Sequence, residues 1–307
     1  MIDFQKLDLT RKKEYDRFLL DCGHRGCEYA FANLYMWGRQ EAAFLDDSLV
    51  IFSQFDRRSV YPFPVIHGDP KPILDALMED AHSRKIRFRI TSMTADERDL
   101  LEELYPGRFR FYADRDGWDY VYAIDDLADL KGKKFQKKRN HVNKFQELHP
   151  NYRTELLCRD NLDMAMELVE QWNQVDPCGD PCSNPGSEFY QECRALRRAF
   201  THFEELELEG MMLLDGDEVL AMTMGSQLSA DCFDLHFEKA LDRPDSAYPV
   251  INRDFARYLR EKYPELRWLN REDDLGLPGL RKAKLSYNPD HLVEKYWALY
   301  REDDDED

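Results

Sequence analysis

The sequence predicts an α+β fold, with mixed sheets flanked by helices, built as two tandem copies of one domain. Strand-like alternation and capped helix-like segments are interspersed along the 307 residues. The order strand, two helices, three strands, helix, strand, helix, strand occurs twice, without convincing residue-for-residue identity between the halves. The 43% of hydrophobic residues suffice for one large or two ordinary domains, which excludes wholesale disorder.

The first half carries clear local signals for its elements. Thr94 and Glu97 form a predicted capping box, and Gly23 is expected to end the first helix. Apolar alternation and turn residues predict these strands: 2–7, 42–46, 49–55, 59–65, 86–92, 108–113 and 118–124. Helical patterns cover these segments: 11–22, 28–38, 70–85 and 95 to about 106.

The second half repeats this order after a short basic segment. Its predicted strands are 152–157, 210–215, 218–227, 231–240, 266–270 and 291–300. Its predicted helices are 161–175, 187–206, 247–263 and 278–285. We therefore expect an N-terminal domain at 1–128, a basic linker helix at 129–149 and a C-terminal domain with an acidic tail at 150–307.

The net charge of −18 is concentrated in the second half. Residues 1–150 carry 25 Lys and Arg against 26 Asp and Glu, whereas residues 151–307 carry 18 against 35. Such a surface repels free nucleic acid, so a phosphate-bearing partner needs a local basic patch. Residues 131–144 provide one, with seven basic side chains and no acid. The last seven residues hold six acids and are expected to form a solvated tail.

Compartment signals favour a soluble, cytoplasmic protein. No stretch approaches the roughly 18 apolar residues that span a bilayer, and the N-terminus lacks the layout of a secretion signal. Seven cysteines without such a signal indicate reduced thiols. Cys178 and Cys182 have no matching second pair, so no metal site is predicted from them.

The basic linker is expected to be an amphipathic helix. At about 100° per residue, Phe135, Val142 and Phe145 fall on one face. The opposite face carries Lys133, Lys137 and Lys144. These lysines are a candidate phosphate-binding ridge for a tRNA acceptor stem or another polyanion. A solvated linker helix that offsets the acidic half is the alternative.

The strand at 231–240 is the candidate catalytic strand. Alternation places Phe233, Leu235 and Phe237 on one face and Asp234, His236 and Glu238 on the other. If the polar face lines a cleft, His236 or Glu238 can take a proton from an attacking amine or hydroxyl. If that face is exposed to water, the three polar residues need no functional explanation.

The segment from Glu272 to Pro289 combines acids, glycines and basic residues after a predicted strand. Glycines at a strand exit let backbone amides approach a ligand, and the start of the next helix favours an anion. The candidate substrate-binding residues here are Asp273, Asp274, Gly276, Gly279, Arg281, Lys282, Lys284 and Tyr287. Acids beside bases suit a substrate with both ammonium and phosphate or carboxylate groups. A turn with a self-neutralising surface network is the alternative.

Three segments resemble a known family: FANLYMW at 31–37, DYVYAIDDLADLKGKKFQKKRNHVNKF at 119–145 and LNREDDLGLPGLRKAKLSYNP at 269–289. They resemble the uncharacterised bacterial DUF2156 family, related to the C-terminal domain of phosphatidylglycerol lysyltransferase. The element order resembles the Gcn5-related N-acetyltransferases (GNAT), and the tandem copies resemble Fem-type aminoacyl transferases. These resemblances imply transfer of an amino acid from a charged tRNA to a lipid head group or a peptide amine. The sequence contains no flippase domain like that of the full lipid synthase, which leaves the acceptor open.

Motifs of other enzyme classes are missing from the sequence. It has no GxxxxGK[ST], HExxH, GxSxG or CxxC, and the loop at 241–252 lacks the Gly-rich pattern with which acetyltransferases bind coenzyme A. We therefore predict an aminoacyl-tRNA-dependent aminoacyltransferase that needs no metal or redox cofactor. Its acceptor is an amine or hydroxyl of a lipid head group, peptide or small molecule. The alternatives are an acyltransferase with a coenzyme A thioester donor and a non-catalytic RNA- or polyanion-binding protein.

Overall fold

The structure, a computed structural model, describes residues 1–55, 58–174, 188–241 and 247–301. The predicted acidic tail after Arg301 lies outside these residues, as does the loop that holds Cys178 and Cys182. Residues 242–246 of the loop at 241–252 also lie outside them.

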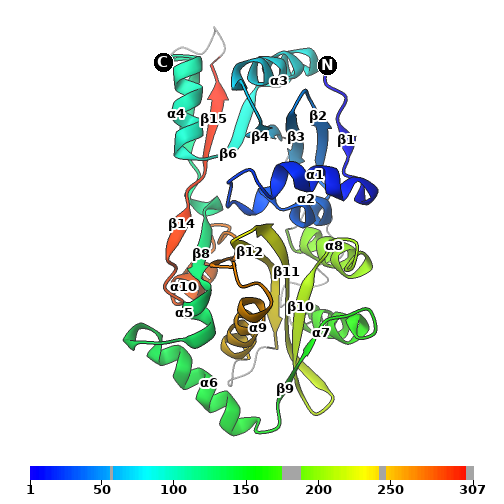
Figure 1. Ribbon diagram of the computed structural model, residues 1–307, viewed down its shortest axis with the longest axis vertical. Coiled ribbons are helices and arrows are strands. Elements are labelled where there is room, and N and C mark those ends of the chain that lie inside the picture. The colour runs from blue at the N-terminus through cyan, green and yellow to red at the C-terminus, as the bar shows by residue number, and fades with distance from the viewer. Residues whose placement is uncertain (56–57, 175–187, 242–246, 302–307) are drawn as a thin grey trace.

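Two mixed sheets form the core, one above the other in Figure 1. The upper sheet has the order β1, β2, β3, β4, β6, β15, β7, with β5 paired to β3. Its strands are β1 (Gln5–Lys6), β2 (Gln40–Phe44), β3 (Ser48–Phe55), β4 (Arg58–Pro62), β5 (Val65–Ile66), β6 (Arg89–Met93), β7 (Phe109–Ala113) and β15 (Tyr296–Tyr300). Its helices are α1 (Lys12–Leu19), α2 (Phe31–Trp37), α3 (Pro70–Arg84) and α4 (Ala95–Leu104).

The lower sheet has the order β14, β8, β13, β12, β11, β10, β9. Its strands are β8 (Asp119–Ala123), β9 (Arg153–Leu156), β10 (Glu209–Asp215), β11 (Glu218–Ser229), β12 (Cys232–Ala240), β13 (Trp268–Asn270) and β14 (His291–Val293). The remaining helices are α5 (Ile124–Asp129), α6 (Gln136–Leu148), α7 (Leu162–Gln174), α8 (Glu188–Thr201), α9 (Tyr248–Lys262) and α10 (Pro278–Leu285). This element order confirms the predicted α+β class.

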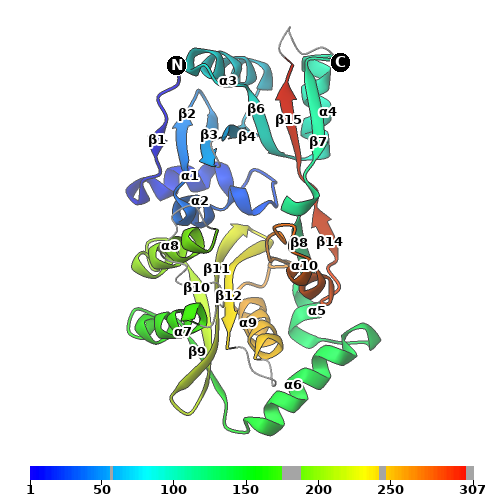
Figure 2. The ribbon, with the colours of Figure 1, turned by 180° about the vertical axis from the view of Figure 1, so that it is seen from behind.

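The two sheets exchange strands. β8 comes from the first half of the chain but pairs with β13 and β14 in the lower sheet. β15 ends the described chain but inserts between β6 and β7 in the upper sheet, as its red arrow shows in Figures 1 and 2. The single strand predicted at 291–300 is therefore wrong: β14 and β15 belong to different sheets. Each sheet thus contains a strand from outside the predicted domain, 1–128 or 150–307, to which its other strands belong. The division of the chain into two folding units stays a prediction.

The predicted capping box forms at the start of α4, but α1 ends at Leu19, so Gly23 does not end this helix as predicted. The Thr94 hydroxyl accepts a hydrogen bond from the Glu97 backbone, and the Glu97 carboxylate accepts one from the Thr94 backbone, which is the predicted capping box. Asp69 caps α3 through the Lys71 backbone, and Pro70 occupies the first turn. These caps fix where α3 and α4 begin.

The predicted amphipathic linker forms as α6, preceded by a short 3₁₀ turn at Lys133–Phe135. Phe135, Val142 and Phe145 are buried, while Lys133, Lys137 and Lys144 are exposed. The two faces are therefore as the helical pattern predicts, and α6 runs along the bottom of the molecule in Figure 1.

A β-bulge interrupts the candidate catalytic strand. Gly225 of β11 pairs with Leu235, and the residue before it, Met224, pairs with Phe237. His236 is therefore the extra residue of β12. A Cβ on Gly225 would lie 2.0 Å from the Asp234 carbonyl oxygen, so only glycine fits here. The bulge sends Phe237 into the core that contains α2 and α8, while Leu235 packs in the core beneath α9.

The prediction that Phe233, Leu235 and Phe237 share one face is therefore wrong. For the same reason the polar residues do not share one face. Asp234 and His236 lie on the side of Glu272, whose carboxylate accepts a hydrogen bond from Asn33 of α2. Glu238 lies on the side of α9 and accepts a hydrogen bond from Asn252.

Candidate functional site

Strands β12 and β13 separate at their carboxyl ends. They pair in parallel up to Asp234 and Asn270, after which β12 continues to Ala240 while the chain after β13 turns away. Across this opening, Nη2 of Arg271 donates to Oε1 of Glu238 at 2.7 Å. Both side chains are only 10 to 13% exposed. Separation of two parallel strands thus places a charged pair in the interior of the sheet.

The Arg271 guanidinium lies among aromatic rings. Its central carbon is 4.7 Å from the ring centroid of Tyr287 and 5.5 Å from that of Tyr122. Nη1 is buried and has no hydrogen-bond partner among the described residues. A guanidinium with one occupied and one unoccupied donor edge is suited to bind a carboxylate or phosphate.

Lys138 reaches the same place from α6. Its Nζ lies 3.4 Å from the ring centroid of Tyr287 and donates to the Ser286 hydroxyl at 2.8 Å. Burial, assisted by the positive charge of Arg271, lowers the pKa of Lys138 to about 8. The sequence contains a signal for this residue, because Lys138 occupies the apolar stripe of α6 between Phe135 and Val142. Our sequence analysis missed both Lys138 and Arg271.

Lys284 closes the turn after β13. Its ammonium group donates to the carbonyl oxygens of Arg271 and Asp273, and burial lowers the pKa of Lys284. Burial also raises the pKa of Asp273 to about 7. Of the predicted substrate-binding residues, Lys284, Asp273 and Tyr287 thus lie beside Arg271, the partner of Glu238.

Asp274 and Arg281 bind each other instead. Arg281 donates to both carboxylate oxygens of Asp274 at 2.8 Å, and this lowers the pKa of Asp274. The backbone amide of Gly276 also donates to Asp274, at 3.0 Å. These contacts are those of the self-neutralising network named as the alternative in the sequence analysis.

The other predicted binding residues lie on exposed surfaces. Gly279 and Lys282 are exposed on α10, and Lys133, Lys137 and Lys144 are exposed on α6. The two helices are neighbours, because Lys138 contacts the residue after α10. The exposed lysines therefore do not enter the opening.

His236 lies in a separate polar cluster toward the first half of the chain. Its Nε2 is 2.8 Å from the Ser226 hydroxyl, and its Nδ1 is 3.1 Å from Oε1 of Glu272 and 3.4 Å from Oδ2 of Asp234. Asn33 of α2 donates to the same Glu272 oxygen at 3.0 Å. Burial, together with the charges of Glu272 and Asp119, raises the pKa of Asp234.

A cavity of about 410 Å³ lies where α1 and α2 face the segment 203–209 and strand β11. Ser226 reaches its wall, so the His236 cluster lies directly behind the cavity. Carboxylates of Asp16, Glu204 and Glu207 line its rim. The sequence analysis did not anticipate this cavity, because its walls come from both halves of the chain.

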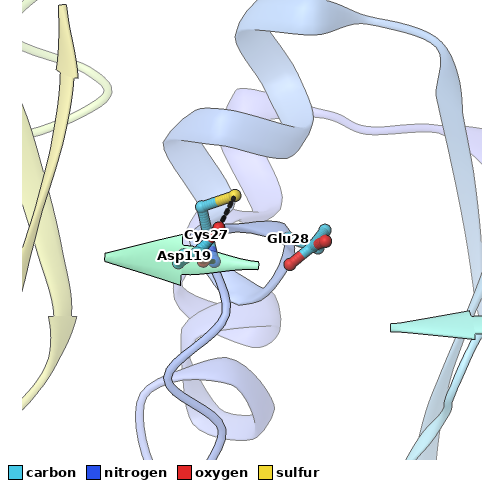
Figure 3. Close-up of side chains that lie close together, drawn as sticks. All are labelled: Cys27, Glu28 and Asp119. Carbon is cyan, nitrogen blue, oxygen red and sulfur yellow. Dashed lines mark hydrogen bonds between the residues drawn. The ribbon is translucent and has the colours of Figure 1, made fainter. Parts of the chain in front are cut away.

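A second acidic cluster lies where the exchanged strands cross. Figure 3 shows Cys27 and Glu28 near Asp119 of β8. The Lys295 ammonium donates to Asp119 at 2.7 Å and contacts Glu28 at 2.8 Å. Burial alone would lower the pKa of Lys295, but Asp119 and its neighbours raise it well above the ordinary value. A lysine therefore already supplies the cation of this cluster.

A model of the family described as phosphatidylglycerol lysyltransferase, C-terminal, matches residues 21–299. The chain belongs to the phosphatidylglycerol lysyltransferase C-terminal family. This membership confirms the resemblance seen in the three sequence segments.

Solved structures share the fold of this family member. A conserved protein of unknown function from Bacteroides thetaiotaomicron VPI-5482 is 37% identical, with a TM-score of 0.92 over 98% of this chain and 100% of that chain. L-PGS from Bacillus licheniformis is 16% identical, with a TM-score of 0.66 over 99% and 95% of the two chains. FemX is 12% identical, with a TM-score of 0.61 over 98% of each chain. The last two similarities establish a common fold.

Among curated proteins, the uncharacterized protein MYCGA3080 of Mycoplasmoides gallisepticum is 24% identical over 183 residues. The match covers 58% of this chain and 54% of that protein, so the chain spans about half the length of this relative. Within the described part of this family member, we find no helix with the length and apolarity needed to cross a membrane.

Proposed function

We propose that the chain transfers an aminoacyl group from a charged tRNA to an amine or hydroxyl acceptor. The observation that carries this proposal is the meeting of Glu238, Arg271, Lys138, Lys284 and Tyr287 at the opening between β12 and β13. Five side chains from three separate segments of the chain provide a carboxylate, cations and an aromatic wall in one place. The family, named for lysyl transfer to phosphatidylglycerol, supports this reaction class.

The proposed reaction needs positioning and proton transfer. The acceptor attacks the ester carbonyl of the aminoacyl-tRNA and Glu238 takes the acceptor proton; as the ester bond breaks, the protonated Glu238 returns this proton to the leaving terminal tRNA hydroxyl. Arg271 holds Glu238 in place, and its second donor edge binds an anionic group of the substrate. His236 remains the second candidate base. The exposed lysines Lys133, Lys137 and Lys144 bind tRNA phosphates in this proposal.

A transfer assay tests the reaction class. The chain is incubated with a panel of radiolabelled aminoacyl-tRNAs and with phosphatidylglycerol vesicles, peptides or small amines, and acylated products are separated. We expect label to move to one acceptor class, and Glu238→Gln to lower turnover by about 10² while tRNA binding is kept.

Two results would contradict the proposal. RNA binding without transfer across the panel would favour a non-catalytic RNA-binding protein. Turnover with coenzyme A thioesters alone would show that the donor is a thioester and not an aminoacyl-tRNA. Lys262→Ala is a suitable control variant, because Lys262 is a cation that pairs with Glu209 at the other end of α9.

A further inference from the structure

We propose that Asp234, His236 and Glu272 form a binding site for a divalent transition-metal cation such as Zn²⁺ or Mn²⁺. One ligand atom from each of the three residues lies within 4.8 Å of the others. The inference does not depend on the transfer reaction with Glu238 as base, and it assigns His236 to the ion in place of the second-base role considered above. It concerns a cluster that lies on the opposite side of β12 from Glu238.

The first argument comes from Asp234. This side chain is fully buried, and neither of its carboxylate oxygens has a hydrogen-bond partner among the described residues. Leaving a buried carboxylate without partners is costly, so buried carboxylates in proteins are paired with a cation, hydrogen bonded or coordinated to a metal. An ion at this point would compensate the negative charge of Asp234 and of the neighbouring carboxylate.

The second argument is the charge of the buried region between the two sheets. Its carboxylates include those of Glu28, Asp119, Asp234 and Glu272, of which Lys295 contacts the first two. Neither Asp234 nor Glu272 has an ion pair with a lysine or arginine among the described residues, and the imidazole of His236 lies between the two carboxylates. The neighbouring cluster thus shows how this fold satisfies such carboxylates, with a cation at their centre.

The third argument is geometry. Ligands held about 2.1 Å from a tetrahedral metal ion are about 3.4 Å apart. Nδ1 of His236 lies 3.1 Å from Oε1 of Glu272 and 3.4 Å from Oδ2 of Asp234. If Nε2 of His236 carries the proton and donates to Ser226, the Nδ1 lone pair faces two carboxylate oxygens, an arrangement that a cation stabilises.

The surroundings of the cluster are also those of a metal site. Metal ligands are usually oriented by a second layer of hydrogen bonds, which Ser226 provides for His236 and Asn33 for Glu272. Glu272 adopts a left-handed backbone with φ of 56°, a strained conformation for a non-glycine residue that aims its side chain at the cluster. One imidazole and two carboxylates form a ligand set typical of zinc and manganese.

The test uses the purified full chain after removal of metals with EDTA. Isothermal titration with ZnCl₂ and with MnCl₂ measures affinity, and elemental analysis after desalting counts bound ions. We expect one ion per chain. Asp234→Asn, which keeps the size of the side chain, should weaken binding at least tenfold, and Glu272→Gln should do the same. Ser226→Ala should weaken it by about tenfold, because it removes only the orienting hydrogen bond.

Glu28→Gln is the matched control, since it alters a carboxylate of the cluster that Lys295 already occupies. It should leave the affinity unchanged. The absence of a bound ion in the wild-type chain would overturn the proposal and would assign a proton or water to Asp234. Binding that survives both Asp234→Asn and Glu272→Gln would also overturn it. These readouts do not depend on aminoacyl transfer, so failure of either proposal can be recognised separately.

Discussion

The pair formed by Glu238 and Arg271 allows the sharpest test of how charge is held at the opening between β12 and β13. The two side chains meet at 2.7 Å and are 10 and 13% exposed. Removing one partner leaves the other as a poorly solvated charge, which costs about 3 to 5 kcal/mol in buried pairs. We therefore expect Glu238→Gln and Arg271→Met each to lower the free energy of unfolding by about 3 kcal/mol.

The double variant should be much less destabilised than the sum of the single variants. Glu238→Gln with Arg271→Met removes both charges, and replacement of a whole buried pair is often close to neutral. The expected coupling energy is therefore close to the sum of the two single losses, about 6 kcal/mol. Urea unfolding at a fixed pH and salt concentration measures all four free energies of the cycle.

An exposed pair of the same chemistry provides the control. Arg153 and Glu155 meet at 2.9 Å, but their side chains are 44 and 39% exposed. The same double-mutant cycle on this pair should give a coupling energy below about 1 kcal/mol. If the Glu238 and Arg271 variants were additive within about 0.5 kcal/mol, the pair would not act as a buried unit, and the role of Arg271 in holding Glu238 would be refuted.

Three further predictions follow from the described contacts. Replacing Lys133, Lys137 and Lys144 with Ala should reduce the slope of log binding constant against log salt concentration for RNA by about 2 to 3. The control triple variant, with Ala at Lys6, Lys13 and Lys71, should keep the wild-type slope. If both triple variants keep the wild-type slope, α6 is only a linker. Acetylation of Lys138, followed by mass spectrometry, should reach half its maximal rate near pH 8, the pKa that burial gives it; because folding lowers this pKa, the free energy of unfolding should rise as pH increases from about 8 toward the ordinary lysine value. Lys295→Met should lower the free energy of unfolding by about 3 to 5 kcal/mol, and Asp119→Asn in the same chain should recover part of it, as thermal or urea unfolding will show; no recovery would mean that this pair is not the source of the loss.

The sequence predicted the fold where local signals decide it. The cap at Thr94, apolar alternation and the heptad-like spacing of Phe135, Val142 and Phe145 each depend on residues a few positions apart. The exchange of strands between the two sheets does not depend on such nearby residues. The segments that become β14 and β15 both have extended patterns, and pairing to residues far away in the chain decides which sheet each one joins.

The candidate site was predictable only in part for the same reason. Alternation around His236 continues without a break in the sequence, and the bulge that reverses it is set by Gly225 on the neighbouring strand. Lys284 and Tyr287 were found because they belong to the segment after the predicted strand 266–270, which carries the family resemblance. Lys138 was overlooked although its place in the apolar stripe of α6 was visible, and Arg271 was overlooked because its partner Glu238 is distant in the chain.

The strand exchange has a further consequence for the two halves. β7 pairs only with β15 in the described structure, so the α4–β7 unit is attached to the upper sheet through a strand that the end of the chain supplies. β8, in turn, pairs only with strands of the second half. Each half alone would therefore expose unpaired strand edges, which favour aggregation. Both crossings are held together where Lys295 meets Asp119, close to the cluster of Asp234, His236 and Glu272. The cavity thus requires that both halves fold together, because each half supplies part of its walls, whereas the proposed metal site takes its three ligands from the second half and only the supporting Asn33 from the first.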